Sequence, residues 1–478
     1  MTKLFNTAKI HILLQPIFLI FGFLWNSFLT KNLSVNDFGL FSLSLTLFSI
    51  LSIFANFGMS GGLMRYIPYY EEKKKYNALK NVYYYSIFLP LAIGIVFYFF
   101  TILLKDIIEK HFIDDFGSIV NILGLYIILN AFISSQMKIS ITNGDFLYTK
   151  IHELIWHKIF PLGFLFLLAF YKKITIVEVA YIYIIGYILF SIIFLKNNYN
   201  YFSKINLKKF KRIFDKNFFK YSFYSSLSGL VSMLYMWSDN IMIGYFLSNY
   251  EVGIYSAIFL VAVIVRNFWY MAFVPILLPV LTRYIARGDR INTKITYDIL
   301  QRTLFLLTIP LFLIFLYFGE KIISLIYTNE YLEGMPTLYA LIFLYLLTIF
   351  FGYATYVINA YGDTKVTFKI TIMSLIVNFI LNIIFIPKFG IIGAAVATGI
   401  SELLYAVICY YVVYKRYKLY INSKLIYFIL LTITTLYVLY LLDSTIQLPV
   451  LVVFMVAYLM YSYITFKEVL ILYKKGDN

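Results

Sequence analysis

Charged residues are scarce in this chain of 478 residues: 13% are charged, whereas 62% are hydrophobic. A soluble protein of this composition would have too little polar surface to cover its core. Apolar runs of about 20 residues follow one another between short charged gaps, and the alternating pattern of barrel strands is absent. The sequence therefore predicts an all-α protein whose helices cross a membrane many times.

Cysteine is represented by Cys409 alone, in an apolar segment, which excludes intrachain disulfides and cysteine metal clusters. The chain also lacks the phosphate-binding G-x-x-x-x-G-K-[ST] loop and the G-x-S-x-G nucleophile motif. His152 and His157 are five residues apart on a predicted helix, which is a poor spacing for one metal ion. We therefore predict a transporter rather than an enzyme, with no metal or other cofactor and no ATP-driven transport by this chain alone.

About fourteen transmembrane helices are predicted, and an even number places both termini on one side of the membrane. Their expected bounds are 10–29, 38–63, 81–104, 117–137, 151–171, 174–195, 221–247, 253–281, 300–319, 335–358, 366–386, 391–413, 425–442 and 446–466. The basic segment Met1–Lys9 leads into the first of them and is interpreted as part of a retained signal anchor.

The distribution of lysine and arginine supports this topology, because both residues favour the cytoplasmic side of a membrane. When Arg302 and Lys369, which lie at the ends of their spans, are counted with the adjoining loops, 31 of the 40 lie on the side of the termini and 7 on the opposite side, while Lys158 and Arg266 fall deeper within spans. We predict a multi-pass protein of the cell membrane with both termini cytoplasmic. The net charge of +17 then reflects topology, and no nucleic-acid partner is expected.

An internal repeat divides the chain. It is seen in LSVNDFGLFS at Leu33–Ser42 and LSNYEVGIYS at Leu247–Ser256, in Arg65-Tyr66-Ile67 and Arg283-Tyr284-Ile285, and in Asn143-Gly144-Asp145 and Tyr361-Gly362-Asp363. The offset of 214 to 218 residues spans six helices, so both copies have the same orientation, as expected of parallel lobes. The repeat predicts an N-lobe at 1–195, a C-lobe at 221–413 and an additional helix pair at 414–478.

The linker 196–220 between the lobes carries eight basic residues with apolar residues at near-helical spacing. This pattern is typical of an amphipathic helix on the anionic cytoplasmic leaflet of a bilayer, although a basic linker that only sets topology explains it equally well. The glycines of Gly58–Gly62 and the small residues of Ile391–Ile400 indicate close helix packing, which could also permit rocking motions.

Arg266 is the strongest functional candidate, because a guanidinium near the middle of an apolar span must face protein or water rather than lipid. Its fork of donors suits a phosphate. A fixed ion pair with Asp239, on the preceding span, is the alternative, and both hold if the pair opens on ligand binding. The offset partners of Arg266 in the first copy of the repeat, Ser52 and Phe48, are uncharged.

Other polar residues within the spans are weaker candidates. Lys158 and His157 could line a cavity, or Lys158 could extend to the interface while His157 pairs with Glu153. Glu402 is a candidate for H⁺ or Na⁺ coupling or a helix–helix hydrogen bond. Asparagines at four positions could face a cavity, although they more often join helices. They are Asn26, Asn240, Asn378 and Asn382.

Three segments resemble the oligosaccharide flippases of the multidrug, oligosaccharidyl-lipid and polysaccharide exporter superfamily. They are WSDNIMIGYFLSNYEVGIYSA at Trp237–Ala257, NAYGDTK at Asn359–Lys365 and NFILNIIFIPKFGIIGAAVATGISE at Asn378–Glu402. The resemblance implies two lobes around a hydrophilic cavity that opens to each side in turn. It also implies that the cargo is a polyprenyl-diphosphate-linked oligosaccharide, whose diphosphate is held by cationic residues such as Arg266 and Lys158.

We therefore expect a flippase that moves this lipid-linked oligosaccharide from the cytoplasmic to the outer leaflet for cell-surface polysaccharide or glycan assembly, with glycan-assembly enzymes as partners. A cation-coupled multidrug antiporter of the same fold is one alternative, and it predicts that Glu402 and Asp239 matter more than Arg266. A membrane-embedded sugar polymerase or ligase is the second, and it would need a sizeable external loop with acid-base residues.

Overall fold

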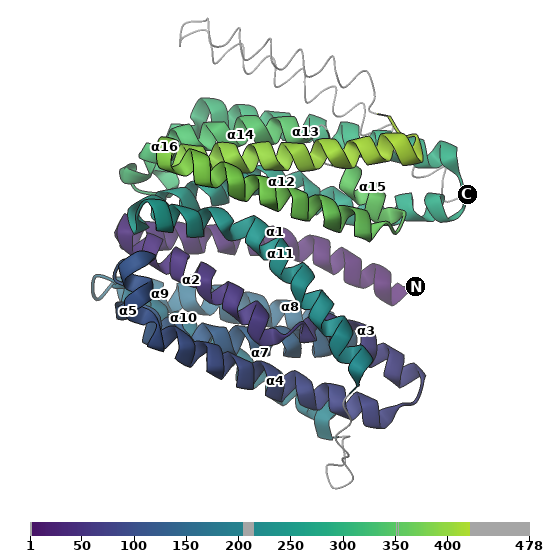
Figure 1. The fold of residues 1–478 in the computed structure, drawn as a ribbon, viewed down its shortest axis with the longest axis horizontal. Helices are drawn as coiled ribbons and strands as arrows, with labels where there is room; N and C mark the ends of the chain where they lie inside the picture. The colour runs from purple at the N-terminus through teal and green to yellow at the C-terminus, as the bar shows by residue number, and fades with distance from the viewer. Residues whose placement is uncertain (1, 204–214, 350, 352, 421–478) are drawn as a thin grey trace, which may run out of the picture. The chain divides into compact units, whose positions relative to one another are not determined.

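The computed structural model describes residues 2–203, 215–349, 351 and 353–420. All regular structure in these ranges is helical (Figure 1). Nine helical segments of the described chain are long and apolar enough to cross a membrane. The predicted all-α, multi-pass architecture is therefore confirmed. The predicted helix pair at 425–442 and 446–466 and most of the linker lie outside the described residues.

The chain forms two compact units. Unit 1 comprises Met1–Ala257, Ile326–Glu333 and Asn382–Ala394; unit 2 comprises Ile258–Leu325, Gly334–Leu381 and Ala395–Asn478, of which residues up to 420 are described. These units are defined by contacts and differ from the lobes expected from the repeat, whose boundaries stay a prediction.

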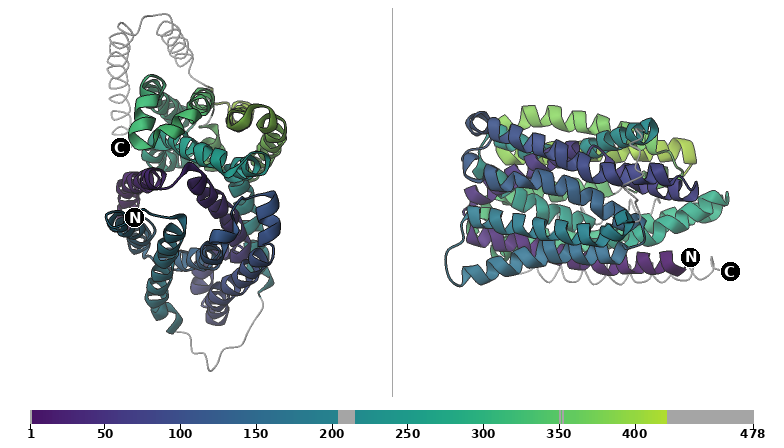
Figure 2. Two further views of the ribbon diagram at one scale, coloured as in Figure 1. Left: turned by 90° about the vertical axis from the view of Figure 1, so that its left-hand side faces the viewer. Right: turned by 90° about the horizontal axis from the view of Figure 1, so that it is seen from below.

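Unit 1 is built mainly from eleven helices. They are α1 (Thr2–Asn32), α2 (Val35–Asn56), α3 (Met59–Glu72), α4 (Tyr76–Leu103), α5 (Lys105–His111), α6 (Gly117–Leu123), α7 (Leu125–Thr142), α8 (Phe146–Leu154), α9 (Phe160–Ala169), α10 (Ile176–Ser203) and α11 (Lys216–Phe246). Helix α7 contacts α2, α4 and α10, while α11 packs along α2 and α3 (Figures 1 and 2). The short α5 occupies most of the predicted external connection 105–116.

Unit 2 contains most of α12 (Asn249–Ala286) and α13 (Arg290–Ile326), followed by α14 (Met335–Ile349), α15 (Ala354–Ala360) and α16 (Thr364–Val412) except Asn382–Ala394, which belongs to unit 1. Helix α16 covers two predicted spans, and Gly390 interrupts it with a φ of 60°. Asn378 bonds Thr398 and Ser374 bonds the carbonyl of Ser401, so the two halves run back along each other. The helical hairpin expected from the two adjacent spans is present.

The repeated sequence at Leu33–Ser42 and Leu247–Ser256 begins a helix in both copies. Ser34 accepts a hydrogen bond from the amide of Asp37 at 3.1 Å and donates to its carboxylate at 2.8 Å. In the second copy, Ser248 donates to the carboxylate of Glu251 and accepts from the amide of Tyr250 at 3.2 Å. The shared S-x-x-[DE] pattern is therefore a capping motif that satisfies amides at the start of α2 and of α12.

The two copies of this sequence also contact each other through their glycines. A Cβ built on Gly39 would lie 1.7 Å from the backbone oxygen of Asn249 and 2.9 Å from the amide nitrogen of Gly253. A Cβ on Gly253, the offset partner of Gly39, would lie 2.3 Å from the oxygen of Val35. Only glycine permits this approach of α2 to α12, so the repeat also encodes the place where its own copies meet.

Glycines also bring the other end of the predicted span 38–63 close to α11. The span is not continuous, because Phe57 and Gly58 adopt left-handed conformations between α2 and α3. A Cβ on Gly58 would lie 1.7 Å from the oxygen of Ser222, and one on Gly61 would lie 1.9 Å from Ser225 Oγ. The expected close packing at Gly58–Gly62 is confirmed, and it holds α3 against the beginning of α11.

Replacing Gly39 with alanine should lower the thermal unfolding midpoint of the purified protein in detergent, because the new methyl group would overlap the backbone of α12. Overpacking of this kind costs about 1–3 kcal/mol or more. Gly163→Ala in α9 is the matched control, since its added Cβ meets nothing within 4 Å. Equal midpoints for the two variants would contradict the close contact.

Candidate functional site

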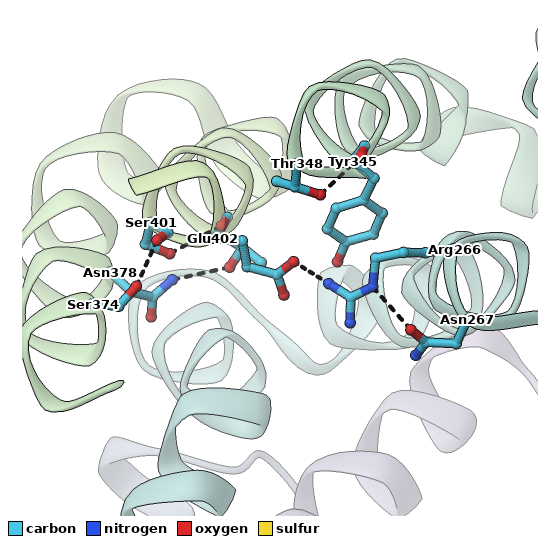
Figure 3. A network of polar contacts seen from close by, with 9 residues as sticks. Arg266, Asn267, Tyr345, Thr348, Ser374, Asn378, Ser401 and Glu402 are labelled. Carbon is cyan, nitrogen blue, oxygen red and sulfur yellow. Dashed lines mark hydrogen bonds and ion pairs between the residues drawn. The ribbon is translucent and has the colours of Figure 1, made fainter. Parts of the chain in front are cut away.

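Arg266 lies near the middle of α12 and forms an ion pair with Glu402 of α16 (Figure 3). Its Nη1 donates to Glu402 Oε2, and its Nε donates to Asn267 Oδ1 at 3.3 Å. The guanidinium carbon lies 4.4 Å from the ring centroid of Tyr345 on α14, in a cation–π contact. Opposite charge and an aromatic face together lower the cost of keeping this cation within an apolar span.

The Arg266–Glu402 pair is only partly covered. The exposed fractions of the two side chains are 21% and 16%, whereas Tyr345 is fully buried. The backbone that carries Glu402 is held by the α16 hairpin, where Asn378 donates to Thr398 at 3.0 Å and Ser374 donates to the Ser401 carbonyl (Figure 3). Neighbouring hydrogen bonds therefore place the backbone of Glu402, while its side chain is only partly covered.

An ion pair with Asp239 was one alternative for Arg266, and the structure instead shows an ion pair between Arg266 and Glu402. Asp239, on α11, accepts hydrogen bonds from the Tyr255 hydroxyl at 2.5 Å and from Asn382 at 2.7 Å. All three side chains are buried. Distance along the helices alone suggested Asp239, but the α16 hairpin brings Glu402 to the guanidinium and Asn382 to Asp239. Glu402 therefore makes a hydrogen bond between helices, as one interpretation of the sequence expected, and this bond is also an ion pair. Its role in ion coupling stays a prediction.

The surroundings of Asp239 have an apolar counterpart in the first copy of the repeat. At the offset of 214, Asp239 corresponds to Trp25 and Tyr255 corresponds to Phe41. Trp25 and Phe41 both pack against Tyr183, with ring centroids 5.8 and 5.7 Å apart. The same helix positions thus hold an aromatic cluster in one copy and a hydrogen-bonded carboxylate in the other.

His157 and Lys158 lie on a π-helical turn, Ile155–Ile159, between α8 and α9. Pro161 follows this turn and lacks the amide that would continue the regular hydrogen-bond pattern. Gly186 of α10 allows close approach, since a Cβ there would lie 2.6 Å from the Trp156 oxygen. Single-turn π-bulges in helices often occur at functional sites.

His157 does not pair with Glu153, contrary to one expectation: Glu153 forms an ion pair with Lys150 at 2.7 Å. The His157 ring instead stacks on Tyr187 at 4.1 Å, and its buried Nε2 has no hydrogen-bond partner among the described residues. Lys158 is partly buried and forms no ion pair within the described part of the chain. The two residues therefore remain candidates, in unit 1, for contact with a polar ligand.

The four asparagines mainly join helices or bond their own helix. Asn240 donates to Ser256 of α12 at 3.1 Å, and Asn378 and Asn382 make the bonds given above. Asn26 donates to the carbonyl of Gly22 in α1 at 2.9 Å. Their contacts match the packing role that the sequence made the first interpretation, and their cavity role stays a prediction.

Two tyrosines of these clusters were missed from the sequence. Tyr345 is one of 46 tyrosines and lies in an ordinary apolar span, so no local pattern marks it. Tyr255 can be recognised from the repeat, because it stands where the first copy has Phe41 and differs from it by one added hydroxyl group. Comparing the copies for new polar atoms, rather than for charges alone, would have found it.

Comparison with known proteins places these features in a family. A family model described as polysaccharide biosynthesis protein matches residues 28–336, more than half of the chain. The chain belongs to this family. It is 27% identical over 384 residues to an uncharacterized membrane protein, MJ1068, of Methanocaldococcus jannaschii, covering 76% of this chain and 74% of that protein. It is 26% identical over 394 residues to the probable low-salt glycan biosynthesis flippase Agl15 of Haloferax volcanii, covering 80% and 78%.

The fold of this family member is that of a solved lipid II flippase, MurJ, in an inward closed conformation. The TM-score is 0.71 with 20% sequence identity, over 98% of this chain and 99% of MurJ. Together these findings make the chain a membrane transporter of the polysaccharide flippase type rather than an enzyme, as the sequence predicted. The polymerase or ligase alternative is therefore wrong.

A double-mutant cycle on Arg266 and Glu402 should show strong coupling in thermal stability. Removing one partner leaves a charge uncompensated within the apolar region. The losses of unfolding free energy in Arg266→Ala and in Glu402→Ala should therefore each exceed half of the loss in the double variant. We expect a coupling energy of about 1–3 kcal/mol. The pair Lys172–Glu178, in which the lysine side chain is 54% exposed, is the control and should couple by less than about 1 kcal/mol. Additive effects at Arg266 and Glu402 would contradict the pair.

Proposed function

We propose that this flippase moves a polyprenyl-diphosphate-linked oligosaccharide from the cytoplasmic to the outer leaflet of the cell membrane, with both termini cytoplasmic. Membership in the polysaccharide biosynthesis family and the resemblance of Trp237–Ala257 to oligosaccharide flippases support a lipid-linked glycan as cargo. The relative Agl15, named as a probable glycan biosynthesis flippase, is consistent with it. Enzymes that assemble the glycan would provide the cargo on the cytoplasmic side.

The observation on which this proposal rests is the partly exposed guanidinium of Arg266 within a membrane span. A diphosphate presents several oxygens that a guanidinium binds through two parallel N–H donors, and such charge-assisted bonds are strong where water is scarce. Arg266 is held by Glu402, Asn267 and Tyr345, so it is preorganised rather than free to extend toward lipid head groups. It is therefore our candidate for the residue that binds the diphosphate.

Lys158 and His157 are proposed as further contacts to the head group from the N-lobe. The lysine would add a second positive charge, and His157 Nε2 is a buried polar atom to which a ligand could offer a hydrogen bond. No bond of the cargo is broken in this process. The protein needs only to bind the head group in both access states, and only moderately, because a site that held the diphosphate too tightly would trap it.

Coupling to an ion gradient is proposed to involve Asp239 rather than Glu402. The charge of Glu402 is compensated by Arg266, and Asp239 is a buried carboxylate that accepts hydrogen bonds from the Tyr255 hydroxyl and the Asn382 amide. A buried carboxylate held in this way is suited to take up H⁺ or Na⁺. Asn382, which bonds Asp239, would move with such an event.

A cation-coupled multidrug antiporter remains the second candidate, because a solved multidrug resistance transporter of the MATE family has a similar fold, with a TM-score of 0.67. That function requires an excess of negative charge facing the cargo. In unit 2 the Glu402 carboxylate is instead paired with a guanidinium, which disfavours binding of a cationic drug at this place. The family match and this pairing together favour an anionic cargo.

Arg266→Ala should reduce flipping of a fluorescent polyprenyl-diphosphate oligosaccharide in proteoliposomes by at least tenfold, because loss of a charged partner for the diphosphate removes on the order of 1.5–3 kcal/mol. Arg266→Lys should retain intermediate activity, since lysine keeps the charge but lacks the planar fork. Parental flipping by a normally folded Arg266→Ala protein would refute the diphosphate contact.

Asp239→Asn should remove the dependence of flipping on an imposed H⁺ or Na⁺ gradient, while flipping in the absence of a gradient should remain measurable. Asparagine keeps the shape of the side chain and one of its two accepting oxygens but carries no titratable charge. The experiment compares initial rates with each gradient imposed and with both collapsed. If the parent itself flips equally fast in all conditions, the coupling role is lost.

A further inference from the structure

We propose that Glu402 is an internal counter-anion that occupies the cargo site of Arg266 in the absence of cargo and is displaced when the diphosphate binds. The inference rests on the proposed function, because it concerns the ligand of the same guanidinium. It goes further by assigning to Glu402 the control of affinity and release. Glu402 is thus a specificity and exchange residue rather than a permanent structural partner.

Three contacts of Arg266 described above differ in charge. Glu402 provides the charge, whereas Asn267 bonds Nε and the ring of Tyr345 lies against the guanidinium (Figure 3). The neutral contacts come from α12 itself and from the fully buried Tyr345 of α14. They would keep the guanidinium in place when the carboxylate leaves, so the Arg266 side chain does not have to be reoriented for each cargo molecule.

Electrostatics requires the carboxylate to leave. A carboxylate and a diphosphate on the same guanidinium are like charges in a region of low dielectric constant, and their repulsion there is much larger than in water. Either the diphosphate fails to bind or Glu402 moves away from Nη1. The exchange of one anion for another keeps Arg266 compensated in both conditions, which avoids an unpaired charge within the membrane at either stage.

The local structure allows Glu402 to move without unfolding its helix. The hydrogen bonds near Glu402 on α16 are made by its neighbours: Asn378 bonds Thr398, and Ser374 and Ser401 form bonds that involve backbone carbonyls. The Glu402 side chain is 16% exposed and can change rotamer while these bonds persist. The hairpin therefore fixes the Cα of Glu402 and leaves its carboxylate as the mobile part.

A displaceable carboxylate also explains how a flippase can release an anionic cargo. Glu402 returns to Arg266 as the diphosphate departs, so dissociation does not leave a bare guanidinium. The apparent affinity of cargo is reduced by the fraction of time that the pair is closed. Removing the carboxylate should strengthen binding and slow release, which is the opposite of what a purely stabilising partner would show.

Binding of farnesyl diphosphate to the purified full chain in lipid nanodiscs tests the proposal. Glu402→Gln should bind this probe on the order of tenfold more tightly than the parent, because glutamine has a similar shape but does not compete as an anion. Multiple-turnover flipping of the lipid-linked oligosaccharide by Glu402→Gln should be slower than by the parent. Glu402→Asp, which keeps the charge, is the matched control and should stay within about threefold of the parental affinity.

Two further variants separate the two proposals. If Arg266→Ala binds farnesyl diphosphate like the parent, the proposed cargo contact fails, and the role of Glu402 fails with it. If Arg266→Ala loses binding but Glu402→Gln binds no tighter than the parent, only the counter-anion role is overturned. Tyr345→Leu should weaken binding in both the parental and Glu402→Gln backgrounds, whereas Tyr345→Phe, which retains the ring, should not.

Discussion

An arginine within an apolar span must have its charge compensated by the protein, and the proposed function depends on this constraint. In the present structure a carboxylate, an amide and an aromatic ring from three helices provide it for Arg266. The Arg266 side chain nevertheless stays partly exposed, at 21%. Under the proposed function, stability and cargo binding compete for this one positive charge, which is the physical reason for proposing a displaceable partner.

The two copies of the repeat share helix starts and helix contacts but differ in some of their side chains. The capping serines Ser34 and Ser248 and the glycines Gly39 and Gly253, through which the copies meet, belong to the framework and occupy equivalent positions in both copies. Other positions differ between the copies: Asp239 and Tyr255 replace Trp25 and Phe41. Duplication thus preserved helix starts and helix contacts, where backbone geometry is demanding, while side chains at other positions were free to diverge.

Much of the framework could be predicted from the sequence because its signals are local. The apolar runs, the asymmetry of the basic residues and the repeat follow from short stretches of chain. Small interruptions were not predicted, such as the break at Gly58 and the π-helical turn at His157, because they depend on how Ser222 and Gly186 approach from other helices. Contacts between distant segments, unlike helix formation, leave little trace in the local pattern.

The sequence by itself determined that the chain is a multi-pass helical membrane protein, that it is duplicated and that Arg266 is its most unusual charge. Those conclusions need only the hydropathy, order and spacing of residues. Only the tertiary structure decided which carboxylate compensates Arg266, because depth along a helix is readable from sequence but the rotation and pairing of helices are not. The hairpin of α16 brings Glu402 to Arg266 and Asn382 to Asp239, and Tyr345 joins the first pair through packing alone.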